Sequence, residues 1–282
     1  MNAKSIAVRQ PRADRKAWSV PSLPAARTVF VGAIPWLLPA AALGLWQLAS
    51  SQAWLPPQIL PAPLAVLTTL LDLLRGGEIA DGLRISLIRI TIGLLIGSSI
   101  GLVVGAIIGC WRRASDYLKP LITAISQVPS LGWVPILILI FGLDEMMKYL
   151  IIAKACFVPT VVATTEGIRN IPAHYLEVGR VLRLRRLTLL RKLIIPAALP
   201  TIFGGLRLAI SYAWIALIVV EMLAATEGVG YTMVWGRTLF QTDIVIAGMI
   251  IIGVIGLLMD MALTRVERHL RRWDPKATEA RQ

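Results

Sequence analysis

Residues 90–111 read ITIGLLIGSSIGLVVGAIIGCW and contain no charged side chain. A helix needs about 20 mainly apolar residues to cross a hydrocarbon core about 30 Å thick, because each residue adds about 1.5 Å. The stretch also carries a glycine at every fourth position: Gly93, Gly97, Gly101, Gly105 and Gly109. Such a stripe lets a second helix approach closely. We expect a transmembrane helix whose glycines pack against another helix of the same subunit, with subunit contact or helix sliding as the alternative.

Five more stretches of similar character occur along the chain. Hydrophobic residues make up 56% of the sequence and charged residues only 16%, whereas soluble proteins carry about 25% charged residues. The sequence therefore predicts an all-α polytopic membrane protein with about six transmembrane helices. The candidate spans are residues 29–48, 90–111, 121–141, 149–165, 206–225 and 244–263. The third contains Pro129 and Pro135, so we expect it to be kinked or broken there.

The cations are clustered between the apolar stretches. The net charge is +13, but the sequence lacks the basic surface with interleaved aromatic residues that nucleic acid binding needs. Cytoplasmic loops of membrane proteins hold the excess of Lys and Arg. With the N-terminus inside, the basic head, residues 112–119, residues 169–192 and the basic C-terminal end all lie on the cytoplasmic side. Both termini are therefore predicted to be cytoplasmic.

Neither a metal site nor a catalytic site is expected. The histidines His174 and His269 lie far apart, and Cys110 and Cys156 each fall inside an apolar stretch, so no metal-ligand spacing is present. No carboxylate pair lies in a span, and the sequence shows no nucleophile with a partner base. No lysine follows a glycine, which excludes a phosphate-binding loop that ends in Gly-Lys-Ser/Thr.

The most informative stretch is the basic connection between the fourth and fifth spans. Residues 167–200 read GIRNIPAHYLEVGRVLRLRRLTLLRKLIIPAALP. Pro172 suits the first turn of a helix, and aliphatic residues recur near helical spacing with arginines between them. This pattern predicts two short amphipathic helices with a bend near Arg183. An interfacial helix held by anionic lipid is the simpler interpretation of such a basic, apolar segment.

The same connection resembles the EAA loop of bacterial ABC importer permeases. In that family the loop forms a coupling helix that inserts into a cleft of a separate ATPase subunit. The matching positions are Glu177, Val178 and Gly179 for the Glu-Ala-Ala triplet, Arg180 next to it, Arg183 at the usual glycine and Pro196 as the terminal proline. Gly179 in place of alanine weakens the helix by roughly 0.5–1 kcal/mol. Arg183 costs roughly 1 kcal/mol if the bend needs a left-handed backbone.

The resemblance covers nearly the whole chain beyond the basic head. It is carried by WQLASSQAWLPPQILPAP from Trp46, GLRLAISYAWIALIVVEMLAATEGVGY from Gly205, LFQTD from Leu239 and ERHLRRWDP from Glu267. These segments are similar to the permeases of the nitrate, sulfonate, bicarbonate and taurine importer group. The first and the last are most similar to the aliphatic sulfonate branch.

This resemblance implies a type I ABC importer permease fold and a set of partners. Residues 1–27 would form a cytoplasmic tail, residues 28–265 the permease domain with its coupling loop at 167–200, and residues 266–282 a second cytoplasmic tail. The chain would lie in the bacterial inner membrane, pair as a homodimer, bind two ATPase subunits and receive substrate from an extracytoplasmic binding protein. It would need no cofactor of its own, because ATP and Mg²⁺ would be bound by the ATPase.

Three charged residues in or near the spans are candidates for the translocation path. Arg89 and Lys154 lie near the outer ends of their spans, where they could attract an anionic substrate, although snorkelling to the interface is the simpler interpretation of Lys154. Glu221 is a poor ligand for an anion, so we expect a structural hydrogen bond or ion pair with a cation of a neighbouring span. The loop from Thr226, TEGVGYTM, is expected to form either a gate or a turn.

Two other functions remain open from the residues alone. A secondary transporter driven by an ion gradient would carry ionisable residues in mid-span and broken helices in matching halves, and only the prolines of the third span suggest this. An intramembrane enzyme would need convergent histidines, acids or a nucleophile at the membrane surface.

Overall fold

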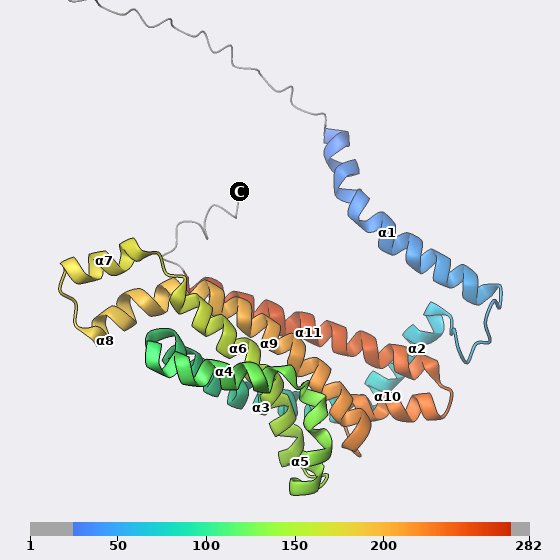
Figure 1. Cartoon of the computed structure of the whole chain (residues 1–282). Helices are drawn as coiled ribbons and strands as arrows, with labels where there is room; N and C mark the ends of the chain where they lie inside the picture. The colour runs from blue at the N-terminus through green and yellow to red at the C-terminus, as the bar shows by residue number, and fades with distance from the viewer. Residues whose placement is uncertain (1–24, 272–282) are drawn as a thin grey trace, which may run out of the picture.

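The computed structural model describes residues 25–271, and every regular element in that range is helical (Figure 1). The elements are α1 (Ala25–Ser51), α2 (Pro63–Gly76), α3 (Glu78–Cys110), α4 (Arg112–Gln127), a 3-10 turn (Ser130–Trp133), α5 (Val134–Phe141), α6 (Glu145–Arg169), α7 (Ala173–Val181), α8 (Arg186–Leu189), a π-helical turn (Leu190–Ile194), α9 (Ile195–Ala224), α10 (Val229–Thr238) and α11 (Thr242–Leu270). The predicted all-α fold is confirmed.

Helix α6 is the centre of the bundle and packs mainly against α3 and α9. Ile151, Ile152 and Cys156 of α6 have no exposed surface, because neighbouring helices cover it on more than one side. On the α9 side, close approach depends on small residues: a Cβ added at Gly205 would lie 2.1 Å from the Cβ of Ala163. Helix α11 continues the layer by packing against α9, α10 and α2.

The glycine stripe of α3 makes the other contact of α6. A Cβ added at Gly97 would lie 2.1 Å from the carbonyl oxygen of Ala153, and one at Gly93 would lie 2.5 Å from the side chain of Ile152. Gly101, Gly105 and Gly109 meet Thr160, Thr164 and Ile168 of α6 in the same way. The stripe therefore serves helix packing inside one subunit, as predicted.

Four helices are long and apolar enough to cross a membrane: residues 79–110, 145–169, 187–224 and 242–270. They contain the second, fourth, fifth and sixth predicted spans. The predicted boundaries of the second span are wrong at its start, since α3 continues N-terminally past Arg89 and Arg84 to Glu78. A span predicted only from an uncharged stretch misses this part of the helix. The end of a membrane helix can carry charged residues that pair with other side chains or reach the interface.

The predicted third span is not one helix. Helix α4 ends at Gln127, and α4 is bent by 86° from the segment Ser130–Phe141. Val128 has an extended backbone with φ −85° and ψ 115°, which is the conformation that a following proline imposes, and Pro129 lacks the amide hydrogen that would continue the helix. The break expected at Pro129 is confirmed. The bent pair raises the number of candidate spans to five.

The first predicted span coincides with α1, which runs 27 residues and is therefore about 40 Å long. Its C-terminal end is tied to the next connection, because the indole nitrogen of Trp46 donates a hydrogen bond to the carbonyl oxygen of Pro61 at 3.0 Å. Of the tails predicted at residues 1–27 and 266–282, residues 1–24 and 272–282 lie outside the described residues, and residues 25–27 and 266–270 belong to α1 and α11. The predicted number of about six spans is therefore reached only if α1 and the bent pair each cross the membrane, in addition to the four long helices.

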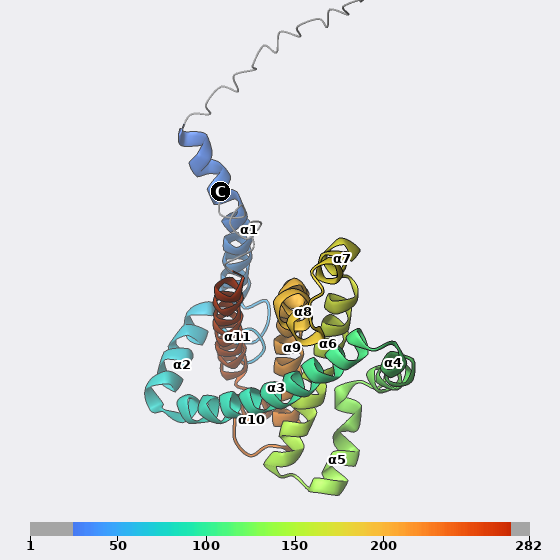
Figure 2. The same cartoon turned by 90° about the vertical axis from the view of Figure 1, so that its left-hand side faces the viewer.

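The two ends of the bundle differ in their elements. Helices α7 and α8 project from the end at which α11 finishes, whereas α2 and α10 lie at the opposite end (Figure 1). Seen from the end that carries α7 and α8, α4 and α5 occupy one flank of α6, and α11 and α2 lie on the other side of α9 (Figure 2). Arg112 and Arg113 begin α4 directly after α3, and Arg169 ends α6 shortly before α7.

Candidate functional site

The connection between α6 and α9 folds as two short helices with a sharp bend. Helix α7 ends at Val181, and α8 begins at Arg186. Between them Arg183 has φ +46°, the left-handed conformation that costs an L-residue roughly 1–2 kcal/mol. The predicted bend near Arg183 is confirmed, and the residue at the bend is strained because it carries a Cβ in a conformation that glycine adopts without penalty.

Gly179 allows α7 to lie directly against α8. A Cβ at this position would lie 2.4 Å from the Cδ1 atom of Leu189. The carbonyl oxygen of Gly179 also accepts a hydrogen bond from the amide of Leu184 at 3.1 Å, which closes the turn. The close approach to Leu189 is the physical reason for a glycine here, beyond the helix-propensity cost that the sequence suggested.

The outer surface of this connection is both charged and apolar. Glu177 is exposed, and Val178 is 53%, Val181 81% and Leu182 63% exposed. Exposed apolar residues in a contiguous group are typical of interaction sites. Arg180 lies in the last part of α7, between Gly179 and Val181.

The return of the chain into the bundle involves Pro196. Pro196 lies in the first turn of α9 and follows the π-helical turn Leu190–Ile194. A proline cannot donate to a preceding carbonyl, and its ring clashes with that carbonyl in a regular α-helix. The wider π turn provides the space, so α8 and α9 continue as one helix from Leu187 to Ala224.

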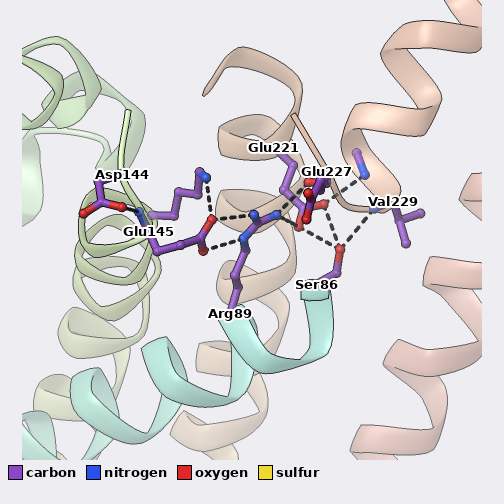
Figure 3. A network of polar contacts seen from close by, with 9 residues as sticks. Ser86, Arg89, Asp144, Glu145, Glu221, Glu227 and Val229 are labelled. Atoms are coloured by element: carbon purple, nitrogen blue, oxygen red, sulfur yellow. Dashed lines mark hydrogen bonds and ion pairs between the residues drawn. The ribbon is translucent and has the colours of Figure 1, made fainter. Parts of the chain in front are cut away.

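At the opposite end of the bundle, Arg89 forms the centre of a buried polar network (Figure 3). Its Nη2 and Nε atoms donate to the two carboxylate oxygens of Glu145 at 2.6 and 2.8 Å. Its Nη1 atom donates to Oε1 of Glu221 at 2.9 Å and to the carbonyl oxygen of Glu227 at 2.7 Å. The side chains of Arg89 and Glu221 are 3% and 1% exposed. The network therefore joins α3, α6, α9 and the loop before α10.

Glu221 also holds the start of α10. Its Oε2 atom accepts a hydrogen bond from the amide of Gly230 at 2.9 Å, and Ser86 donates to both carboxylate oxygens at 2.7 and 2.9 Å. The Ser86 hydroxyl in turn accepts from the amide of Val229 at 3.1 Å. A carboxylate near the first amides of a helix is favourable, because those amides have no partner within the helix. Gly228, with φ +116°, provides the turn that brings α10 to this carboxylate.

This geometry gives Arg89 and Glu221 different roles. The ion pair expected for Glu221 is present, and its partner is Arg89. Because two carboxylates flank the Arg89 guanidinium, it presents no free charge to an incoming anion, and its position favours a structural role over the attraction of substrate. The loop from Thr226 forms the turn into α10. The sequence did not point to Ser86, Glu145 or Lys148, which complete the network.

Lys154 has a different environment. Its ammonium donates to the carbonyl oxygen of Val128, at the break after α4, and lies 5.9 Å from the centre of the Trp133 ring. It lines a cavity of about 790 Å³ between α6, α9 and the segment 126–131, with Ser126, Ser130, Glu166 and Tyr212 among the polar lining residues. Lys154 thus lines a cavity, whereas the side chains of Arg89 and Glu221 are buried in the polar network.

Arg207, which precedes Glu221 by fourteen residues in α9, has acidic partners as well. Its guanidinium contacts the carboxylate of Glu267 and lies 3.5 Å from Oδ1 of Asp260. These contacts join α9 to α11 near the end from which α7 and α8 project. Arg207 therefore takes part in a contact between helices.

The comparisons with known proteins agree with this fold. Residues 81–272 match the family of binding-protein-dependent transport system inner membrane components. The chain is 38% identical over 237 residues to "Putative aliphatic sulfonates transport permease protein SsuC" of Bacillus subtilis strain 168, covering 84% of this chain and 86% of the relative. It is 39% identical over 241 residues to the protein of the same name from Escherichia coli K12, covering 86% of this chain and 92% of the relative.

A solved structure shows the same fold. A chain of the MetNI methionine ABC transporter in inward-facing conformations superposes with a TM-score of 0.59 at 15% identity, covering 68% of this chain and 96% of that chain. The fold is that of a type I ABC importer permease. The protein belongs to the family of binding-protein-dependent transport system inner membrane components.

Family membership settles several expectations. The chain is a multi-pass membrane permease of an ABC importer of the bacterial type, and its partners include an ATPase and a substrate-binding protein. It is not itself catalytic, and ATP is bound by the ATPase subunit.

Proposed function

We propose that this protein is the permease subunit of an importer for a small organic anion, an aliphatic sulfonate. The observation that carries the proposal is the identity of 38–39% to two sulfonate-type permeases over 84–86% of this chain. Taurine, nitrate and bicarbonate are the alternative substrates within the same importer class.

The coupling loop that contains Glu177, Val178, Gly179, Arg180 and Arg183 docks the ATPase through its exposed side chains. An exposed acidic residue beside the exposed apolar Val178, Val181 and Leu182 offers both charge and contact area to a partner. The continuity of the helix from Leu187 to Ala224 provides a stiff connection from this surface into the bundle. Closure of the ATPase on ATP would move the loop, and Pro196 and α9 would carry that motion to the far end as a rigid body.

Two copies of the chain form the complex, each docking one ATPase subunit. The flank of α6 and α9 that carries the cavity exposes Leu208, Tyr212 and Ile215, which either lipid or a second copy could cover. Lys154, Glu166 and the serines on the same flank favour protein or water over lipid, because hydrocarbon leaves polar groups unsatisfied. The translocation path then runs between the two copies, and one subunit type implies two-fold symmetry.

The docking role is tested by replacing Glu177 with Trp and Gly179 with Leu in the full complex. We expect co-purification of the ATPase and ATP-driven uptake to fall at least about tenfold, because bulk at these positions displaces the docking surface and separates α7 from α8. Asp72→Trp and Gly76→Leu, which place the same residues at the opposite end of the bundle on exposed positions, serve as controls. Unchanged ATPase association and uptake in the loop variants would refute the role.

The substrate is tested by growth of a deletion strain on single sulfur sources. Complementation with this permease should restore growth on ethanesulfonate and other alkanesulfonates, with taurine as a sulfur control and nitrate uptake measured separately. If the strain grows on taurine but on no other sulfonate, or if it takes up nitrate but does not grow on sulfonates, the proposed substrate is wrong and one of the alternatives takes its place.

A further inference from the structure

The cavity on the flank of α6 has one cationic side chain in its lining. Lys154 is the only Lys or Arg among its lining residues. Most of the remaining lining is apolar and small, as in ligand pockets that use few polar groups to orient their ligand. The volume of about 790 Å³ lies within the usual range of about 300–1,000 Å³ for sites of small molecules.

Lys154 differs from the other membrane cations in its partners. Arg89, Lys148 and Arg207 each form an ion pair with an acidic side chain. Among the side chains that the structure describes, in residues 37–271 except 78, 180 and 186, no carboxylate is an ion-pair partner of Lys154. Its partners are a carbonyl oxygen and an aromatic ring, which orient the ammonium without neutralising it. A charge in a span costs about 2.5–3.5 kcal/mol at the bilayer centre, so such residues tend to be functional.

The charge along the cavity is asymmetric. Lys154 and Glu166 both line it from α6 and are twelve residues apart, which corresponds to about 18 Å along the helix. Lys154 lies on the half nearer the Arg89 network, and Glu166 lies nearer the docking loop. An anion in the cavity is therefore attracted to the Lys154 end and repelled from the Glu166 end.

We propose that Lys154 is the residue that binds the anionic group of the substrate in the translocation path, held in place by the Val128 carbonyl and the Trp133 ring. The apolar part of the substrate would lie against Val158, Val162 and Leu208 on the cavity wall. This inference rests on the proposed function as an anion permease, and it names the residue and the cavity that distinguish an anion from a neutral solute.

Local charge can be measured with thiol reagents on the assembled complex. Ile215, a 55% exposed lining residue, is replaced by cysteine after Cys110, the exposed native cysteine, is changed to alanine. In the Ile215→Cys parent we expect a sulfonate-bearing methanethiosulfonate to react faster than a trimethylammonium-bearing one. K154M should lower the ratio of the first rate to the second about tenfold. Ethanesulfonate should slow the anionic reagent in the parent and not in K154M. An unchanged ratio in K154M would overturn the inference.

Transport supplies the second measurement, in proteoliposomes with the ATPase and the binding protein. K154M should lower ethanesulfonate uptake about tenfold, while its ATP hydrolysis stimulated by the binding protein stays within about twofold of the parent. K154R should restore most of the uptake. R75M changes an exposed cation outside the cavity and should leave uptake unchanged. Parallel loss of uptake and hydrolysis, or full uptake by K154M, would refute the role. If the parent carries a different anion, the proposed substrate is wrong, and the labelling ratio still decides the role of Lys154.

Discussion

Arg89 holds three helices and a loop together at one buried point. Its five donors are arranged as a planar fork that suits two carboxylates at once, and Glu145 and Glu221 approach it from α6 and α9. A buried ion pair of this kind contributes little compared with apolar packing, but the loss of one partner leaves an uncompensated charge. Removal of the Arg89 side chain is therefore expected to lower the stability of the fold by more than the ion pairs themselves add to it.

We predict that Arg89→Met destabilises the folded permease by about 3–5 kcal/mol, because Glu221 would remain buried without its cation. The measurement is the thermal unfolding midpoint in detergent micelles. Arg84→Met is the matched control, since Arg84 lies on α3 five residues before Arg89 and is exposed, and it should leave the midpoint nearly unchanged. Equal midpoints for the two variants would contradict the structural role of Arg89.

Arg183 provides a test of backbone strain at the bend. Glycine adopts the left-handed conformation without the penalty of a Cβ, so Arg183→Gly should stabilise the bend by about 1 kcal/mol. The hydrogen exchange of the Leu184 amide, which donates to Gly179 across this turn, should slow about fivefold. Arg185→Gly, at a neighbouring position without positive φ, should not slow it. Faster exchange in Arg183→Gly would show that the bend needs the arginine side chain.

At the scale of the elements, the contact between α3 and α6 depends on the absence of side chains. Gly97 faces a backbone carbonyl that cannot rotate away, so an added methyl group must move one helix relative to the other. The same helix contributes Ser86 and Arg89 to the network at the other end of the contact. Displacement of α3 would therefore disturb both the packing and the polar network.

We predict that Gly97→Ala destabilises the protein by about 1–3 kcal/mol, the usual cost of overpacking. Gly253→Ala is the same substitution in α11 at a position where an added Cβ meets no atom within 4 Å, and it should be neutral or slightly stabilising because alanine favours helix. Unfolding midpoints of the purified variants compare the two. A neutral Gly97→Ala would mean that the two helices are not in the close contact described.

The sequence predicted the elements better than the contacts between distant residues. The glycines of α3 could be assigned to packing because a four-residue spacing has a direct geometric meaning, and Pro129 marked the break because proline removes a donor. The partners of Arg89 lie 56 and 132 residues away, so no local pattern identifies them. The cost of Gly179 was estimated from helix propensity, whereas its close contact with Leu189 depends on the angle between α7 and α8.

At the scale of the whole molecule, the elements at the two ends define an orientation. We predict that the docking loop and both termini are cytoplasmic and that α10 is extracytoplasmic, because the basic clusters lie at the loop end. Single cysteines at Val181, 81% exposed, and Phe240, 75% exposed, can be labelled with an impermeant maleimide in right-side-out vesicles of a Cys110→Ala protein. Phe240→Cys should react and Val181→Cys should react only after lysis; the reverse pattern would invert the topology.

The energy source of transport distinguishes an ABC permease from a transporter driven by ions. Proteoliposomes that contain the permease, its ATPase and the binding protein can be loaded with ATP on the side of the docking loop and assayed for ethanesulfonate uptake. We predict uptake that requires ATP hydrolysis and the binding protein, and that persists when ionophores collapse proton and sodium gradients. Uptake driven by an imposed proton or sodium gradient in the absence of ATP would contradict the assignment.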